Sequence, residues 1–338
     1  MAKNERLEQL VERFCAADRL ALARIITLVE SGGDEVAALM EQLYGRTGRA
    51  CVIGVTGSPG AGKSTLVNRM VAGYRQGGRS TAVVAVDPSS PFSGGSVLGD
   101  RVRMTEHWAD PGVFIRSLST RGWRGGLSRA ARDVVRLLDA FGFDVVLIET
   151  VGVGQTELAI MDLADTTVVV TVPEGGDAVQ VMKAGLNEIA DLFVVNKSDR
   201  DGAGRLKAEL QLSVELSGNK QGWRPPVLLT SALRNEGISE LLDAVDRHIE
   251  FVRAGERAAA QAQRRVREFL DVLLGEIERR AGRAAASGAE PAVLALVREG
   301  RLNPYAAARR VLEYDGALAQ VLGLGRGQPA AEPPASRQ

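Results

Sequence analysis

Short apolar runs alternate with amphipathic stretches through the middle of the chain. Runs rich in Val, Ile and Leu predict β-strands at residues 51–56, 81–86, 113–116, 144–149, 166–172, 191–195 and 226–230. Several of these runs are almost continuously apolar, as expected for strands that are buried on both faces. The helical spacing between successive strands implies right-handed crossovers, so we predict an α/β fold with a mostly parallel central sheet.

Helical patterns flank this region on both sides. Apolar residues recur at helical spacing between Leu20 and Val29, and a second apolar stripe runs from Val266 to Ile277. We therefore predict an N-terminal helical segment, an α/β domain, a C-terminal helical extension and a tail, at residues 1–48, 49–253, 254–322 and 323–338. The tail is rich in Gly, Pro, Ala and Ser, and we expect it to be disordered.

A glycine-rich segment connects the first predicted strand to the helix after it. It reads G-x-x-x-x-G-K-S from Gly57 to Ser64, which is the phosphate-binding P-loop in its required context. Backbone N–H groups and the helix N-terminus would bind phosphate, Lys63 would reach the β- and γ-phosphates, and Ser64 would ligate Mg²⁺. The predicted fold is therefore a P-loop NTPase with Lys63 as a catalytic residue. The nucleotide-binding residues predicted here are Ser58, Pro59, Gly60, Ala61, Gly62, Lys63, Ser64 and Thr65.

Two loops at later strand ends predict recognition of a guanine base. Asn196-Lys197-Ser198-Asp199 directly follows a predicted strand, at the edge where an open α/β sheet binds ligands. The Asp199 carboxylate can accept hydrogen bonds from guanine N1–H and the 2-amino group, two donors that adenine lacks. The loop after the last strand would back the base with its own N–H groups. The base-binding residues predicted from these loops are Asn196, Lys197, Asp199, Ser231, Ala232 and Leu233.

Carboxylates at other strand ends are candidate magnesium ligands. Glu149 ends the strand at 144–149 beside the P-loop and can hold Mg²⁺ directly or through water, as a catalytic residue. Asp87 and Asp100 are further candidates, although aspartate equally favours turns and helix starts. Gln155, in a glycine-rich loop that can move, is placed to orient a water molecule, and an exposed structural role fits it equally well. The predicted metal ligands are Ser64, Asp87, Asp100 and Glu149.

The net charge and the hydropathy of the chain limit the classes of partner that we expect it to bind. The 338 residues include 42 Lys and Arg and 42 Asp and Glu, so the formal net charge is zero. A neutral chain has no overall attraction to nucleic acid or to an anionic membrane. The sequence also lacks an apolar signal core near Met1 and an apolar run of roughly 18 residues that would span a bilayer. We predict a cytoplasmic protein with neither a nucleic-acid nor a membrane partner.

Taken together, these motifs resemble the MeaB/ArgK family of P-loop GTPases, which includes proteins similar to the methylmalonic aciduria type A protein. The resemblance extends from the N-terminal helices to about residue 322. The segments that carry it are GVTGSPGAGKST at 54–65, VDPSSPFSGGSVLGDRVRM at 86–104, ETVGVGQTE at 149–157, VPEGGDAVQVMKAG at 172–185 and NKSD at 196–199. Most GTPases have aspartate at the position of Glu149, so this residue indicates a subfamily.

The resemblance implies a function that residue spacing cannot show. Members are GTP-dependent chaperones that gate cofactor loading into adenosylcobalamin-dependent acyl-CoA mutases and protect or reactivate them. It also implies a homodimer joined through the C-terminal helical extension. The same resemblance assigns switch I to 87–104, switch II to 149–157 and a switch III to 173–185, where Asp177, Gln180 and Lys183 would couple the bound GTP or GDP to the mutase.

Two other functions stay open at the level of sequence. A metallochaperone GTPase that serves nickel enzymes would be expected to carry a Cys/His cluster, whereas Cys15, Cys51, His107 and His248 are scattered. A P-loop kinase for a small molecule would not need N-K-x-D. An older description of some relatives as arginine/ornithine transport ATPases would predict ATP use, and Asp199 argues against it. The mutase could be methylmalonyl-CoA mutase or a close relative such as 2-hydroxyisobutyryl-CoA mutase.

Overall fold

The structure, a computed structural model, describes most of the chain in nine stretches. They are residues 2–32, 35–87, 105–119, 126–150, 163–174, 189–217, 222–255, 258–286 and 292–313. These residues fall into two compact units that divide between Glu256 and Arg257. The predicted tail at 323–338 lies outside the described residues.

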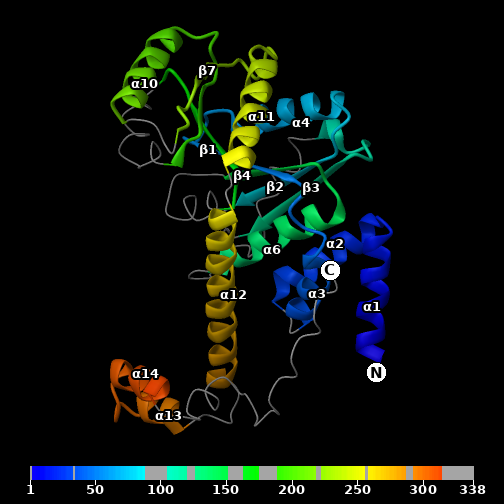
Figure 1. The fold of residues 1–338 in the computed structure, drawn as a ribbon, viewed down its shortest axis with the longest axis vertical. Coiled ribbons are helices and arrows are strands. Elements are labelled where there is room, and N and C mark those ends of the chain that lie inside the picture. The colour runs from blue at the N-terminus through cyan, green and yellow to red at the C-terminus, as the bar shows by residue number, and fades with distance from the viewer. Residues whose placement is uncertain are drawn as a thin grey trace. The chain divides into compact units, whose positions relative to one another are not determined.

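A parallel sheet of seven strands forms the centre of the first unit, in the order β3-β2-β4-β1-β5-β6-β7 (Figure 1). The strands are β1 (Cys51–Gly57), β2 (Thr81–Asp87), β3 (Val113–Ser119), β4 (Val145–Thr150), β5 (Thr166–Thr171), β6 (Leu192–Val195) and β7 (Val227–Leu229). The predicted α/β fold with a parallel sheet is thus confirmed. β4 and β5 lie on either side of β1. The loop after β1 therefore lies at the topological switch point, which is where open α/β sheets bind ligands.

Helices cover both faces of this sheet. On one face α1 (Ala2–Cys15), α2 (Arg19–Ser31), α3 (Glu35–Tyr44) and α6 (Gly126–Phe141) pack on even-numbered strand residues such as Val84 and Val146. On the other face α4 (Lys63–Gln76) and α11 (Ile238–Gly255) pack on odd-numbered residues of β1, β2 and β4, such as Ile53 and Val83, and on even-numbered residues of β5, such as Val168. α10 (Ala203–Ser217) covers β5–β7. The alternation follows from the two-residue period of a strand.

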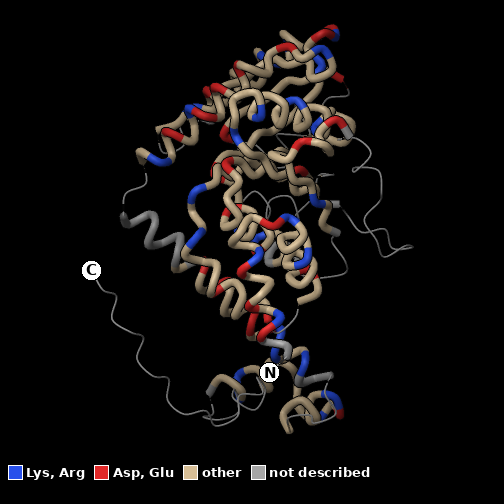
Figure 2. The backbone as a smooth tube through the Cα atoms, turned by 90° about the vertical axis from the view of Figure 1, so that its right-hand side faces the viewer, with Lys and Arg blue, Asp and Glu red and all other residues tan. Residues whose placement is uncertain are grey.

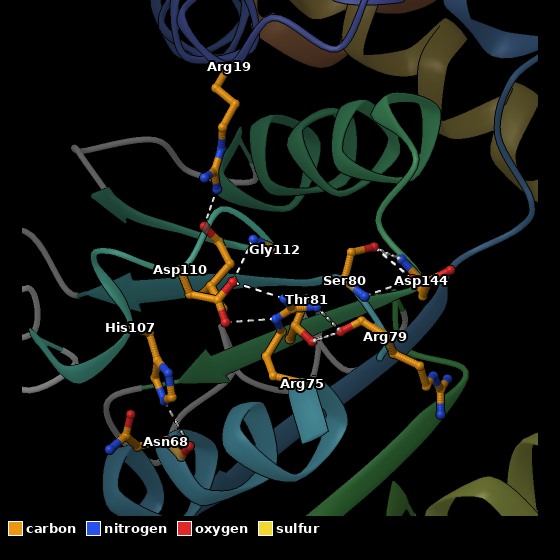
Figure 3. Close-up of polar contacts among 11 residues, drawn as sticks. Arg19, Asn68, Arg75, Arg79, Ser80, Thr81, His107, Asp110, Gly112 and Asp144 are labelled. Carbon is orange, nitrogen blue, oxygen red and sulfur yellow. Dashed lines mark hydrogen bonds and ion pairs between the residues drawn. The ribbon is translucent and has the colours of Figure 1, made fainter. Parts of the chain in front are cut away.

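Polar contacts hold the strands together at their amino ends, away from the P-loop (Figure 3). Arg75 at the end of α4 donates from Nε and Nη2 to the two carboxylate oxygens of Asp110, each at 2.9 Å. The Gly112 N–H, just before β3, donates to Asp110 Oδ1 at 2.7 Å. Between β2 and β4, Ser80 Oγ donates to Asp144 Oδ2 at 2.7 Å. The Arg75 hydrogen bonds, followed by that of Gly112, hold the pKa of Asp110 below its ordinary value.

The second unit contains the long helix α12 (Ala258–Ala286) and the shorter helices α13 (Ala292–Arg298) and α14 (Pro304–Glu313). Large apolar side chains on α12 are 41–63% exposed, namely Val266, Phe269, Leu270, Leu273 and Leu274. Acidic and basic residues are interspersed along the described chain (Figure 2). Among the described helices, none combines the length and apolarity needed to cross a membrane.

Candidate nucleotide-binding site

The loop after β1 has the backbone that a P-loop requires. Gly57, Gly60 and Gly62 have φ angles of +139°, +75° and +85°, a region that favours glycine. A Cβ at Gly57 would stand 1.9 Å from the Val170 carbonyl oxygen, so no larger residue fits there. The loop closes on Lys63, the first residue of α4, and its N–H groups therefore converge at a helix N-terminus.

Lys63 lies inside the curve of this loop. Its side chain is buried, and Nζ donates to the carbonyl oxygens of Gly57 at 2.7 Å and Ser58 at 3.0 Å. These bonds fix the ammonium at the concave side of the loop, where the charge of a bound triphosphate would lie. Of the neighbouring predicted residues, Ser58 and Ala61 are buried, while Pro59, Gly60 and Thr65 are exposed.

Ser64 and Glu149 meet beside the P-loop, although 85 residues separate them in sequence. Ser64 Oγ donates to Glu149 Oε1 at 2.5 Å. Glu149 is buried, and its backbone is paired in register with Val55 of the adjacent strand β1. Parallel pairing of β1 with β4 thus delivers the carboxylate to the first turn of α4. A hydroxyl and a carboxylate oxygen are the hard donors that Mg²⁺ takes from proteins, so these two residues fit that ion.

Asn196 joins the P-loop to the predicted base-binding loops. Its Nδ2 donates to the carbonyl of Ala61 at 2.8 Å, inside the P-loop. Its Oδ1 accepts from Thr230 Oγ1 and from the Ala232 N–H, both at 3.1 Å. Three segments far apart in sequence are therefore held by one buried amide. A Cβ at Gly62 would stand 2.6 Å from Asn196 Nδ2, which further restricts the P-loop.

Asp199 is held with its carboxylate ionised at neutral pH. Ser231 Oγ donates to Oδ1 at 2.8 Å, and Arg234 Nη2 lies 3.5 Å from Oδ2. The Ser231 hydrogen bond and then the backbone N–H of Asp199 lower the pKa of this carboxyl group. Burial opposes them, and the Arg234 charge adds a smaller lowering. An ionised carboxylate only accepts hydrogen bonds, which is what pairing with guanine N1–H and the 2-amino group requires.

One residue that the sequence did not single out, Arg69, supports this site beside the predicted Lys197 and Leu233. Arg69, on α4, donates from Nε to the carbonyl of Ala232 at 3.1 Å and so ties the base loop to the P-loop helix. Lys197 adopts a left-handed backbone at φ +56°, and Leu233 presents an 81% exposed side chain next to Ala232. Helical spacing places Arg69 on α4 but gives no signal that it reaches a loop 163 residues later.

Several predicted site residues are outside this description. Asp87 ends β2, with its backbone opposite Ser119, but its side chain is not among those described. The other predicted residues outside the described stretches are Asp100, Gln155, Asp177, Gln180 and Lys183. The site as described is therefore built from the P-loop, Glu149, Asn196 to Asp199 and the loop from Thr230 to Leu233.

A P-loop with its lysine and serine in place, joined through Asn196 to an ionised Asp199 after β6, defines the class of P-loop GTPases. Residues 22–286 match the family model described as "Methylmalonyl Co-A mutase-associated GTPase MeaB". The chain belongs to this family. It is a mutase-associated GTPase that binds GTP and GDP and hydrolyses GTP. The family resemblance and the GTPase activity expected from the sequence are thereby confirmed.

Individual relatives agree with this assignment. The chain is 45% identical to a putative GTPase of Pyrococcus abyssi over 313 residues, which cover 91% of this chain and 96% of the relative. It is 38% identical to the mouse protein named "Methylmalonic aciduria type A homolog, mitochondrial", over 77% of this chain and 68% of the relative. Among solved structures, "Crystal structure of LAO/AO transport system kinase" superimposes with a TM-score of 0.60 at 28% identity, covering 91% of this chain and 96% of that one.

Proposed function

We propose that this protein uses GTP hydrolysis to gate cofactor loading into an adenosylcobalamin-dependent acyl-CoA mutase, and to protect or reactivate that enzyme. The mutase would be methylmalonyl-CoA mutase or a close relative such as 2-hydroxyisobutyryl-CoA mutase. The observation that carries the proposal is the match to a mutase-associated GTPase family over residues 22–286. This range includes every described residue of the nucleotide site and the whole of α12.

The proposal includes a magnesium ion at the P-loop. Ser64 Oγ and the Glu149 carboxylate, 2.5 Å apart, would hold the ion directly or through water, and Asp87 and Asp100 would complete the ligand set. When bound, Mg²⁺ neutralises charge on the β- and γ-phosphate oxygens. Lys63 contributes a fixed positive charge on the same side of the loop, and Gln155 would orient the attacking water.

The proposal also includes a homodimer joined through α12 in the cytoplasm. Exposed apolar side chains on this helix lie at helical spacing at Val266, Phe269, Leu270, Leu273 and Leu274, and Val272 is also exposed. Exposed leucine and phenylalanine in a continuous stripe cost free energy in water, which burial against a second copy would recover. In this arrangement Asp177, Gln180 and Lys183 remain the proposed residues that couple the nucleotide to the mutase.

The direct test is steady-state GTP hydrolysis by the purified protein, alone and with each candidate mutase at saturating GTP. We expect slow basal turnover that accelerates only with the cognate mutase, because the partner stabilises one conformation of the switch segments. Lys63→Ala should abolish turnover in both conditions, which assigns the activity to this chain. Equal rates with and without every mutase, together with no complex on size-exclusion chromatography, would contradict the proposed function.

A further inference from the structure

Glu174 contacts the loop that carries the guanine-recognition motif. It lies three residues after the end of β5, while Lys197 and Arg200 follow the neighbouring strand β6. One carboxylate oxygen forms an ion pair with Arg200 Nη1, and the other lies 3.8 Å from Lys197 Nζ. Lys197 and Arg200 are the two cations of the loop at residues 196–202, which we call the recognition loop. Both thus face the same carboxylate, which comes from the loop after β5.

A second contact joins the same two loops. Gly202, at φ +89°, lies against Pro173, because a Cβ built on Gly202 would be 3.7 Å from Pro173 Cβ. The Leu206 N–H donates to the Gly202 carbonyl at 2.9 Å, so this glycine also starts α10. Residues 173–174 therefore contact the recognition loop at its beginning, through Lys197, and at its end, through Gly202.

The recognition loop needs such support, because its conformation is unfavourable for an unrestrained chain. Lys197 has a left-handed backbone at φ +56°, which a residue with a Cβ seldom adopts. Asn196 before it is anchored to the P-loop, and Asp199 after it is anchored to Ser231. Lys197 and Arg200 carry the positive charges of the turn, and Glu174 lies against both of them.

We propose that Glu174 is a positioning residue for guanine recognition. It touches no base itself and acts by holding Lys197 and Arg200, so that Asp199 is presented in a fixed orientation. Because Glu174 is the second residue of the segment assigned to switch III (173–185), it ties the base loop to the start of that segment. The proposal rests only on guanine-nucleotide binding, and a failure of the proposed mutase function would leave it intact.

The test compares Glu174→Gln with Glu215→Gln in the full chain. Glu215 pairs with Arg224 at 2.5 Å and is likewise half exposed, but it lies on α10. We expect GDP release from Glu174→Gln to be about two- to fivefold faster than from the wild type, the range that an exposed ion pair supports. Release from Glu215→Gln should match the wild type, and both variants should melt at similar temperatures.

Two further readouts separate positioning from general loosening. Inosine diphosphate lacks the 2-amino group, so the preference for GDP over it should fall in Glu174→Gln and stay unchanged in Glu215→Gln. Arg200→Gln should add little to Glu174→Gln, because the two changes break the same contact. The proposal would be overturned if Glu174→Gln released GDP at the wild-type rate and kept the wild-type preference for GDP over inosine diphosphate. A wild-type protein that fails to bind GDP would overturn the nucleotide site as well.

Discussion

At the scale of single residues, two polar side chains organise the site. The side-chain amide of Asn196 forms hydrogen bonds with the P-loop and with the loop after β7. Asp199 keeps its negative charge through the hydroxyl of Ser231. We therefore propose that Asn196 sets where the base lies relative to the phosphates, and that Asp199 determines which base is accepted.

Replacing Asp199 should change the base preference of the enzyme. Asp199→Asn removes the charge that accepts from guanine and should weaken GTP binding by roughly 1.5–3 kcal/mol. Xanthosine triphosphate should then bind better than GTP, because its 2-oxo group accepts where the 2-amino group donates. Fluorescent-nucleotide titration measures both affinities. Asp201→Asn is the control, since Asp201 is exposed nearby. Equal binding of ATP and GTP by the wild type would contradict guanine recognition.

Substitution of Ser64 should mainly change Mg²⁺-dependent nucleotide affinity, whereas substitution of Glu149 should mainly change kcat. Ser64→Ala removes a proposed metal ligand, so nucleotide affinity should fall more with Mg²⁺ present than with chelator. Glu149→Ala should lower kcat more than affinity, by about tenfold or more, if Glu149 acts through water, because such a group mainly positions the ion. Isothermal titration and single-turnover hydrolysis separate the two quantities. Full turnover in Glu149→Ala would remove this carboxylate from the site.

At the scale of elements, the pairing of parallel strands explains how distant residues meet. The sheet places the loops after β1, β4, β5 and β6 at one edge, whereas the contacts at the opposite ends of the strands maintain its register. Arg75 and Asp110 are central to that second edge, because they connect the end of α4 to the start of β3. The nucleotide site at one end of the strands therefore depends on contacts formed at the opposite end.

The Asp110 contact predicts a specific pH dependence of stability. Because the folded-state pKa is lowered, the stabilisation is complete above the ordinary value of 3.8 and is lost as pH falls through the lowered pKa. Asp110→Asn should cost about 1 kcal/mol at neutral pH and progressively less below about pH 4. Urea unfolding at several pH values measures this, with the exposed Asp243→Asn as control. A penalty that does not change with pH would contradict it.

Local sequence predicted the elements better than their contacts. The strands were predictable because buried apolar runs are local signals, and the P-loop because its glycines and lysine are contiguous. β3 runs to Ser119, beyond its predicted end at Arg116, because its parallel pairing with β2 continues to Asp87 opposite Ser119. The charge of Arg116, which interrupts the apolar pattern, pairs with Glu30 on α2. Likewise, the bonds from Arg69 to Ala232 and from Glu174 to Arg200 depend on how the sheet brings loops together, which no local pattern encodes.

The apolar stripe on α12 predicts the oligomeric state. Leu274→Glu places a charge among exposed apolar side chains, and we expect it to convert a dimer into a monomer because a buried unpaired charge is costly. Leu216→Glu, on α10, is a matched control because Leu216 is also an exposed leucine. Sedimentation at several concentrations measures the mass. A wild-type monomer, or a Leu274→Glu dimer of unchanged affinity, would contradict the proposed interface.

At the scale of the whole molecule, the proposed function couples a guanine-specific site to the control of a partner enzyme. The family match over residues 22–286 shows a mutase-associated GTPase, and control of the mutase is the part that we propose. Coupling requires that the partner bind the two nucleotide states with different affinity, because a ligand with equal affinity for both shifts nothing. The proposed function thus predicts that mutase loading follows the nucleotide accepted at Asp199.

The most direct measurement is recovery of mutase activity during cofactor loading, with GTP or xanthosine triphosphate and with wild type or Asp199→Asn. The account predicts that the wild type supports loading with GTP alone. Asp199→Asn should support it with xanthosine triphosphate alone, because only the base contact has changed. Loading that proceeds equally with either nucleotide, or without any, would contradict the claim that this GTP site gates the mutase.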